Sequence, residues 1–124
     1  NNVNCIFDNE RPIYVQLVEK IRMEIISGGF QPGERIPSVR ELALAVKVNP
    51  NTMQKALVEL ESEGLLYTER KNGKFVTNNQ EMIDIIKKDL AKDKVNLFLD
   101  DMKKIGICHE EAIQYLQEIG GHKE

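Results

Sequence analysis

The fold is most directly indicated by VNPNTMQKALVELESEGLL, residues 48–66, which has the pattern of an amphipathic helix. Asn49 suits the N-cap of this helix and Pro50 its first position, where the missing N–H of proline has no intrahelical partner to lose. Gly64 predicts its end. The apolar positions recur at the i, i+3, i+4 and i+7 spacing of a buried helical stripe: Met53, Ala56, Leu57 and Leu60.

The first turn of the same helix is unusually polar, with Asn51, Thr52, Gln54 and Lys55 close together. The amides of Asn51 and Gln54 can bond bidentately to adenine, and Lys55 can donate to guanine. The hydroxyl of Thr52 can hydrogen-bond to a base or a phosphate, and a helix N-terminus also attracts phosphate. The alternative interpretation is that these are ordinary solvated helix positions.

The sequence before this helix predicts two more helices. Apolar residues that recur with a period of about 3.6 residues indicate a helix over residues 13–27. Gly28 ends this helix, and a turn follows at residues 31–34. Ser38 and Glu41 form a capping box that starts a short helix. The inward face of that short helix is expected to be Val39, Leu42, Ala43 and Val46. Two helices joined by a tight turn, the second with a polar front, match the helix-turn-helix design, in which the second helix enters the major groove.

The sequence after the quoted helix predicts a β-hairpin. Two β-prone runs, residues 65–70 and 74–77, flank Lys71-Asn72-Gly73, and Asn-Gly in such a setting is a strong hairpin signal. Basic side chains around this turn can follow the DNA backbone or enter the minor groove. We therefore expect a mainly α fold with a small β-hairpin, a winged helix-turn-helix DNA-binding domain over residues 1–78.

Residues 79–124 predict a short α-helical dimerisation tail. A long helix is expected over residues 80–105 and a second over residues 109–119, joined by Gly106-Ile107-Cys108. Two such helices are too few to bury their apolar faces, and a second copy in a two-fold dimer is the simplest remedy. The candidate dimerisation residues are Ile86, Leu90, Leu97, Phe98, Met102, Ile105, Ile113, Leu116 and Ile119.

Composition and charge are those of a soluble globular protein, with 41% hydrophobic and 30% charged residues. No apolar run approaches the ~18 residues of a membrane span, and the start lacks the layout of a signal peptide, so we expect a cytoplasmic protein without a membrane partner. Residues 1–78 hold ten basic and ten acidic side chains, so the net charge of −3 lies in the tail. A local basic face in the first part is compatible with this distribution.

The sequence contains no pattern typical of an enzyme or a metal site. Cys5 and Cys108 are too few for a zinc site, and we expect two unpaired thiols in a reducing compartment. His109 and His122 are interpreted as surface residues. No nucleophile has a base at usable spacing, so we expect no catalytic residues, no metal and no cofactor.

Three segments resemble the GntR family of bacterial transcription regulators: GGFQPGE at residues 28–34, IPSVRELA at residues 36–43 and LESEGL at residues 60–65. The resemblance covers residues 12–76 and implies a winged helix that binds an operator. It implies that Arg40 contacts the DNA backbone or guanine, that residues 49–55 begin the recognition helix, and that residues 71–73 form the wing tip. The full set of candidate DNA-binding residues is Arg35, Ser38, Arg40, Asn49, Asn51, Thr52, Gln54, Lys55, Arg70, Lys71, Asn72, Gly73 and Lys74.

The chain departs from the family pattern at two places. Asn49-Pro50 stands where much of the family has Ser-Arg, so an operator preference cannot be transferred. Lys71-Asn72-Gly73 stands where the wing often has Gly-x-Gly, which adds a charge and a side chain at the tip.

The Asn-Pro-Asn-Thr run and the short tail are similar to the YtrA-type subfamily. That resemblance implies a homodimeric repressor of a palindromic operator, controlling membrane-transport operons. The sequence does not indicate which operator, which genes or whether an effector exists. The alternative is a winged helix that docks onto proteins instead of DNA, which would require a blocked or acidic helix front.

Overall fold

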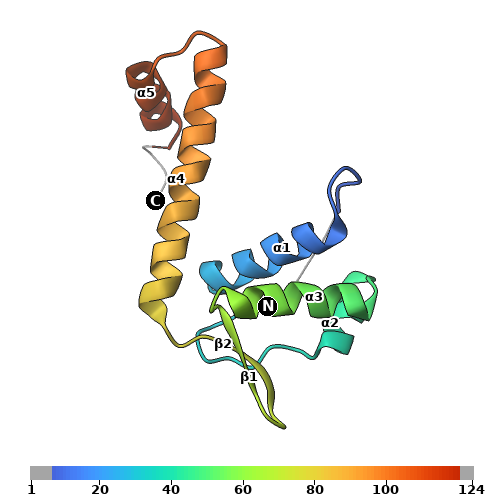
Figure 1. The fold of residues 1–124 in the computed structure, drawn as a ribbon. Helices are drawn as coiled ribbons and strands as arrows, with labels where there is room; N and C mark the ends of the chain where they lie inside the picture. The colour runs from blue at the N-terminus through green and yellow to red at the C-terminus, as the bar shows by residue number, and fades with distance from the viewer. Residues whose placement is uncertain (1–6, 121–124) are drawn as a thin grey trace. The chain divides into compact units, whose positions relative to one another are not determined.

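The chain contains five helices and one hairpin within the described part, residues 7–120, of the computed structural model (Figure 1). It divides into two compact units, Asn1–Ile86 and Lys87–Glu124, and helix α4 begins in the first and ends in the second. The predicted boundary after residue 78 stays a prediction. The elements are α1 (Ile13–Ser27), α2 (Val39–Val46), α3 (Pro50–Ser62), β1 (Leu66–Glu69), β2 (Gly73–Val76), α4 (Gln80–Lys104) and α5 (His109–Gly120).

The core of the first unit forms where α3 packs against both α1 and α2 (Figure 1). The predicted stripe of α3 is buried, since Met53, Ala56, Leu57 and Leu60 are all inaccessible to solvent. Leu17, Ile21 and Ile25 of α1 belong to the same core, and each is at most 1% exposed. Burying one such side chain contributes about 1.5–3 kcal/mol, so this cluster is the main source of the unit's stability.

The predicted caps of α2 and α3 are confirmed. The Ser38 hydroxyl accepts from the Glu41 N–H at 3.1 Å, and the Ser38 N–H donates to the Glu41 carboxylate at 2.9 Å. Lys47 closes α2 in the left-handed conformation with φ 60°, which turns the chain sharply into α3. The Asn49 side chain then caps α3, with Pro50 at the first position. These local signals fix the angle between the two helices of the helix-turn-helix.

The predicted hairpin is present and antiparallel, with Leu66 opposite Val76 and Glu69 opposite Gly73. The two left-handed residues at its tip are not the consecutive pair Asn72 and Gly73 that the sequence suggested. Lys71 takes that conformation with φ 71°, together with Gly73 at φ 102°. A side chain with a Cβ is disfavoured there by about 1–2 kcal/mol, so the tip holds some strain.

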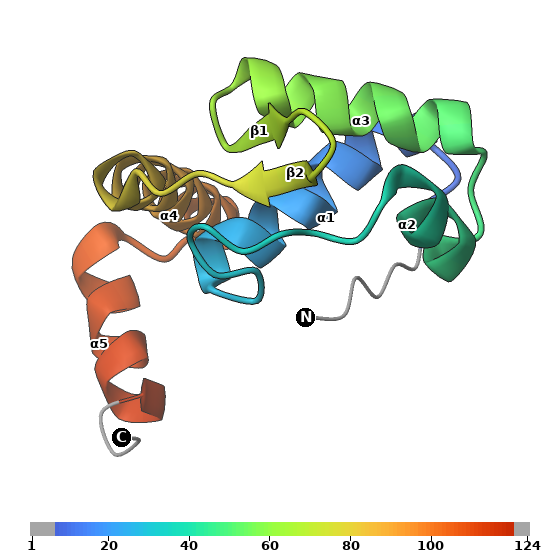
Figure 2. The same cartoon turned by 90° about the horizontal axis from the view of Figure 1, so that it is seen from below.

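A third extended segment pairs with the hairpin, and the sequence pattern had indicated only a turn there. The Val76 N–H donates to the Glu34 carbonyl at 2.9 Å, and the Ile36 N–H donates to the Lys74 carbonyl at 3.0 Å. Arg35 forms the bridge opposite Phe75. Figure 2 shows this segment, between α1 and α2, alongside β2. Strand β2 is therefore held by backbone bonds on both of its edges.

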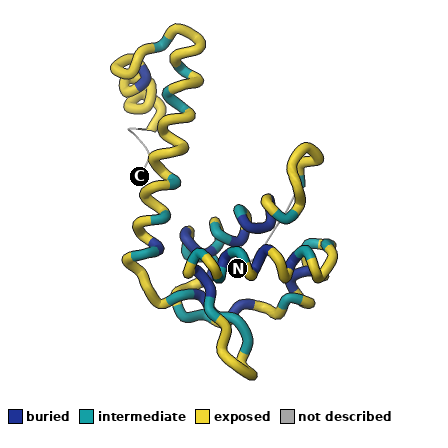
Figure 3. The backbone as a smooth tube through the Cα atoms, in the orientation of Figure 1, coloured by how far each residue is buried: buried dark blue, intermediate teal, exposed yellow. Residues whose placement is uncertain are grey.

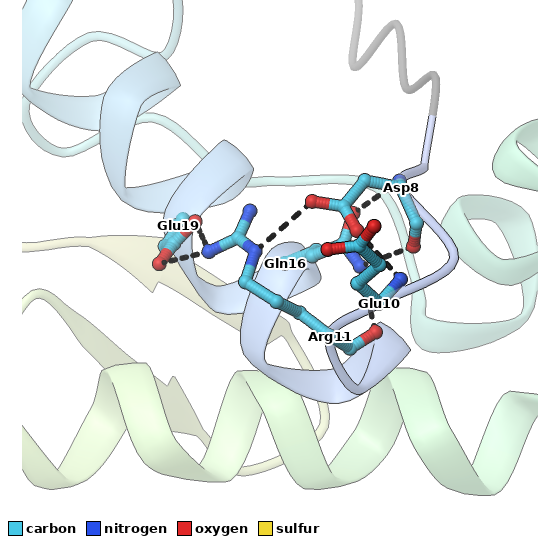
Figure 4. Close-up of polar contacts among 5 residues, drawn as sticks. All are labelled: Asp8, Glu10, Arg11, Gln16 and Glu19. Carbon is cyan, nitrogen blue, oxygen red and sulfur yellow. Dashed lines mark hydrogen bonds and ion pairs between the residues drawn. The ribbon is translucent and has the colours of Figure 1, made fainter.

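The N-terminal end of α1 is fixed by a buried glutamine that the sequence pattern did not single out (Figure 4). The Gln16 amide accepts from the Asp8 N–H and donates to the carbonyls of Asp8 and Arg11, each at 2.8 Å. Arg11 also pairs with Glu19 at 3.0 Å and Asp8 at 3.2 Å. The Glu10 N–H and the Arg11 guanidinium hold the pKa of Asp8 below its ordinary value. The chain before α1 is therefore anchored by polar contacts.

The second unit is far less buried than the first (Figure 3). Gly106 turns the chain between its helices with φ 86°, as predicted. Ala112 is its one fully buried apolar side chain among the described residues. By contrast Ile83, at the start of α4, belongs to the first unit and is buried there.

Candidate nucleic-acid interface

The front of α3 presents most of the predicted base-reading side chains to solvent. Asn51, Gln54 and Lys55 are exposed, and Thr52 is half-buried. In the described part of the chain, the side chains of Asn51 and Gln54 make no hydrogen bond. Asn49 differs, because its side-chain oxygen accepts from the Asn51 N–H at 2.7 Å and so serves as the cap. Two amides at the start of this helix are therefore free to bond to a partner.

The side chain of Lys55 contacts an aromatic ring on another helix. Its ammonium lies over the ring of Tyr14 of α1, 4.3 Å from the ring centroid. The Tyr14 hydroxyl donates to the Glu59 carboxylate at 3.3 Å. Tyr14 is itself half-buried. Periodicity within α1 gives no signal for a contact with α3.

The start of α2 holds a second pair of candidates, Ser38 and Arg40. Ser38 is occupied by the capping box, and its hydrogen bonds hold the pKa of Glu41 below its ordinary value. Arg40 is exposed, and its guanidinium has no ion-pair or hydrogen-bond partner among residues 7–120. Of the two, Arg40 is the side chain available to DNA.

The wing tip carries the exposed side chains Arg70, Lys71 and Asn72. The Asn72 amide donates to the Glu69 carboxylate at 3.3 Å, a contact within the tip itself. The guanidinium of Arg35 lies against Gly73, where an added Cβ would come within 3.1 Å of its Nε. The structure thus brings Arg35 to the wing, and a glycine gives it room.

Lys74 lies in β2 one position from the wing tip, opposite Thr68, and its ammonium is bound to neighbouring side chains. Its side chain is 16% exposed, and its Nζ lies 3.1 Å from Glu61 of α3 and 2.9 Å from the Thr68 hydroxyl. Burial alone would raise the pKa of Glu61, but Lys74 and Thr68 bring it below its ordinary value. A DNA contact by Lys74 stays a prediction, while its observed contact ties the wing to α3. Glu61 was not singled out from sequence.

The predicted dimerisation residues lie on both units and are mostly accessible. Leu97, Ile105 and Ile119 are 62%, 71% and 72% exposed, and Ile113 and Leu116 are also exposed. Ile86 and Leu90 are half-buried. Within the second unit, an apolar groove of about 430 Å³ is lined by Phe98, Met102, Ile107, Tyr115, Leu116 and Ile119. This much uncovered apolar surface is typical of an interaction site.

The described residues hold no group of three or more His, Cys, Asp or Glu side chains able to bind a metal. Cys108 is a free, exposed thiol, and Cys5 and His122 lie outside the described residues. No described helix has the length and apolar character needed to cross a membrane.

Comparison with known proteins identifies the fold. Residues 13–76 match the model for bacterial regulatory proteins of the gntR family. The transcriptional repressor YtrA of Bacillus subtilis is 33% identical over 109 residues, which cover 87% of this chain and 84% of that protein. The solved structure of a GntR family regulator from Listeria monocytogenes superposes with a TM-score of 0.83 and 39% identity, covering 90% of this chain and 98% of that one.

A third comparison concerns a relative solved with DNA. The DNA-binding domain of AraR, in complex with operator ORX1, matches with a TM-score of 0.56 and 32% identity, covering 62% of this chain and 99% of that one. The matched residues 13–76 contain the buried stripe of α3, the capped turn before it and the wing after it. The chain belongs to the GntR family of bacterial transcription regulators, with a winged helix-turn-helix as its DNA-binding domain, and it is not an enzyme.

Proposed function

We propose that this regulator is a homodimeric repressor that binds a palindromic DNA operator through the front of α3, the start of α2 and the wing. The observation that carries the proposal is the free polar front of α3, where the amides of Asn51 and Gln54 have no partner within residues 7–120. Unpaired, exposed amides at the start of a recognition helix are suited to bond to adenine edges. YtrA, a repressor, and AraR, solved on an operator, support the same assignment by similarity.

The other contacts divide into base reading and backbone binding. Arg40 is placed to meet a guanine or a phosphate, because its guanidinium is exposed and unpaired in the described region. Arg70 and Lys71 are exposed on the wing tip, where basic side chains neutralise phosphates or enter the minor groove. Arg35 supports the wing from beside Gly73. Lys74 contributes indirectly in this scheme, by holding the wing to Glu61.

The second unit supplies the dimer contact in this proposal. Its groove and the exposed Ile105, Leu116 and Ile119 leave apolar surface that a second copy can cover. A two-fold dimer presents two recognition helices, which is why we expect a palindromic operator. The similarity to YtrA-type regulators extends the proposal to a cytoplasmic protein that controls membrane-transport operons.

The proposal is tested by titrating the full chain against random-sequence duplex DNA at low salt. A DNA-binding regulator is expected to bind with a Kd of about 10⁻⁴–10⁻⁶ M even without its operator. Selection from a random duplex pool should then enrich an inverted repeat. The absence of binding at low salt would favour the alternative, a winged helix that docks onto proteins.

A further inference from the structure

Lys55 and Tyr14 form a contact between α3 and α1. Lys55 is exposed on the front of α3, and its ammonium lies 4.3 Å from the centroid of the Tyr14 ring on α1. An ammonium over an aromatic face is attracted by the negative face of the ring. The contact therefore restricts a side chain that otherwise has four rotatable bonds and many conformations.

A competing partner for Lys55 lies one turn along the same helix. Glu59 follows Lys55 by four residues, the spacing at which opposite charges on a helix readily pair. Within residues 7–120, however, these two side chains form no ion pair. The Glu59 carboxylate instead accepts from the Tyr14 hydroxyl at 3.3 Å.

Tyr14 therefore acts on both members of the potential pair. Its ring engages the ammonium of Lys55, and its hydroxyl engages the carboxylate of Glu59. Burial and the nearby Glu59 carboxylate raise the pKa of Tyr14, so its hydroxyl stays a donor throughout the physiological pH range.

The surroundings of Tyr14 allow it this role. A shallow hollow beside it is lined by Tyr14, Val15, Val18, Glu19, Arg22 and Glu59. Farther along the same two helices, Arg22 pairs with Glu63 at 2.6 Å. Together with the buried core between α1 and α3, that ion pair holds the two helices in contact at sites other than Tyr14.

We propose that Tyr14 is a positioning residue for DNA recognition: it keeps the ammonium of Lys55 at the front of α3 and prevents Lys55 from folding back onto Glu59. The inference rests on the proposed function, since it takes Lys55 as a DNA contact. It adds to that function a residue outside the helix-turn-helix, on α1, that sets how strongly one recognition side chain acts.

The test is a double-mutant cycle on the full chain, using a duplex selected with the wild-type protein from a random pool. Tyr14→Leu removes ring and hydroxyl and should weaken binding about threefold to fivefold, because an attraction of cation–π strength no longer holds Lys55 in its binding conformation. In a Lys55→Met background, Tyr14→Leu should change binding by less than about 1.5-fold, because the residues are in contact and their effects are not additive. Equal losses in both backgrounds would overturn the inference.

Glu59→Gln supplies a second and independent arm. Removing this carboxylate should improve binding more in the Tyr14→Leu protein than in the wild type, because only there does Glu59 compete for Lys55. An equal improvement in both proteins would show that Glu59 acts by general repulsion of DNA and would contradict the proposal.

A measurement on the wild-type protein covers the case in which Tyr14→Leu fails to fold. The ring current of Tyr14 should move the NMR signals of the Lys55 ε-methylene protons upfield from their values in a solvated lysine. Unshifted signals would overturn the contact itself. Wild-type protein that binds no duplex DNA at low salt would overturn the proposed function, whereas binding without Tyr14–Lys55 coupling would overturn this inference alone.

Discussion

The two units of the chain differ in how completely they bury their apolar side chains. In the first unit, α1, α2, α3 and the hairpin surround one core, and large side chains such as Phe30 and Leu57 are fully buried. In the second unit, Ala112 is buried while Leu116 and Ile119 remain more than half exposed. A unit with a complete core can leave polar groups free for DNA, whereas an incomplete one gains stability by binding another apolar surface. This contrast supports our proposal that the first unit recognises DNA and the second unit self-associates.

The largest expected effect separates a leucine in the complete core from one on the open surface. Leu57→Ala should lower the free energy of unfolding by about 2–5 kcal/mol, because the side chain is fully buried and leaves a cavity. The matched change Leu116→Ala, at a side chain 55% exposed, should cost less than about 0.5 kcal/mol in dilute protein. Denaturant unfolding measures both. Similar losses would remove the contrast between the units.

The second prediction concerns association. Leu116→Asp should weaken self-association by about 2 kcal/mol, because it places a carboxylate in the apolar groove. Sedimentation over a range of concentrations measures the shift from dimer to monomer. Gln114→Asp, an exposed change on the same helix, is the control and should leave the dimer intact. A wild-type chain that is monomeric throughout would contradict the role given to the second unit.

The third prediction sharpens the role of the first unit. Arg40→Ala should weaken operator binding by about 1–3 kcal/mol, the usual loss for a good base or charged contact. Lys20→Ala, an exposed change on α1 outside the candidate set, should have little effect in the same titration. Operator affinity unchanged in the combined Arg40→Ala and Gln54→Ala variant would remove this face of the unit from the DNA interface.

The fourth prediction uses the strained wing tip. Lys71→Gly relieves a side chain at φ 71° and should raise the free energy of unfolding by about 0.5 kcal/mol after the entropy of the added glycine is counted. The same change removes a charge, so the slope of log Kobs against log salt should flatten by roughly 0.9 if Lys71 contacts phosphate. Lys71→Asn keeps a side chain at the tip without the charge and should reproduce the slope change. An unaltered slope in both variants would place residue 71 off the DNA.

The smallest expected effect is the pH dependence of the contact between wing and α3. The folded-state pKa of Glu61 lies below its ordinary value of 4.5, so this stabilisation is present above that value and is lost as the pH falls through the folded-state pKa. Because the Glu61 side chain is 35% exposed, the contribution should be only about 0.5 kcal/mol. Unfolding measured against pH should show it in the wild type and lack it in Glu61→Gln. An identical acid dependence in both proteins would exclude the contribution.

Most of the fold could be predicted from the sequence because its signals are local. The stripe of α3, the Ser38 capping box and the Asn49 cap each act within a few residues of the chain, and the structure has each as predicted. The pairing of Arg35 with Phe75 could not be predicted in this way, because the partners lie 40 positions apart and the short extended segment has no strand pattern.

The candidate site was predictable in its residue types but not in its internal contacts. The free amides of α3 follow from helix periodicity, which places them away from the buried stripe. The contact of Lys55 with Tyr14 and the ion pair of Lys74 with Glu61 join different elements. Such contacts depend on how side chains meet after packing. Lys74, a predicted DNA-binding residue of the wing, thus also has a partner on α3.

The backbone bonds on both edges of β2 have a consequence for how this regulator can diverge. Main-chain groups make those bonds, so they persist whatever side chains residues 70–72 carry. Changes of amino acid at the tip can therefore accumulate without breaking these backbone bonds, and if the tip contacts DNA as proposed, single substitutions there would alter the DNA preference. A deletion or insertion between positions 33 and 36 would instead shift the register of its pairing with β2. The length of that segment is therefore constrained.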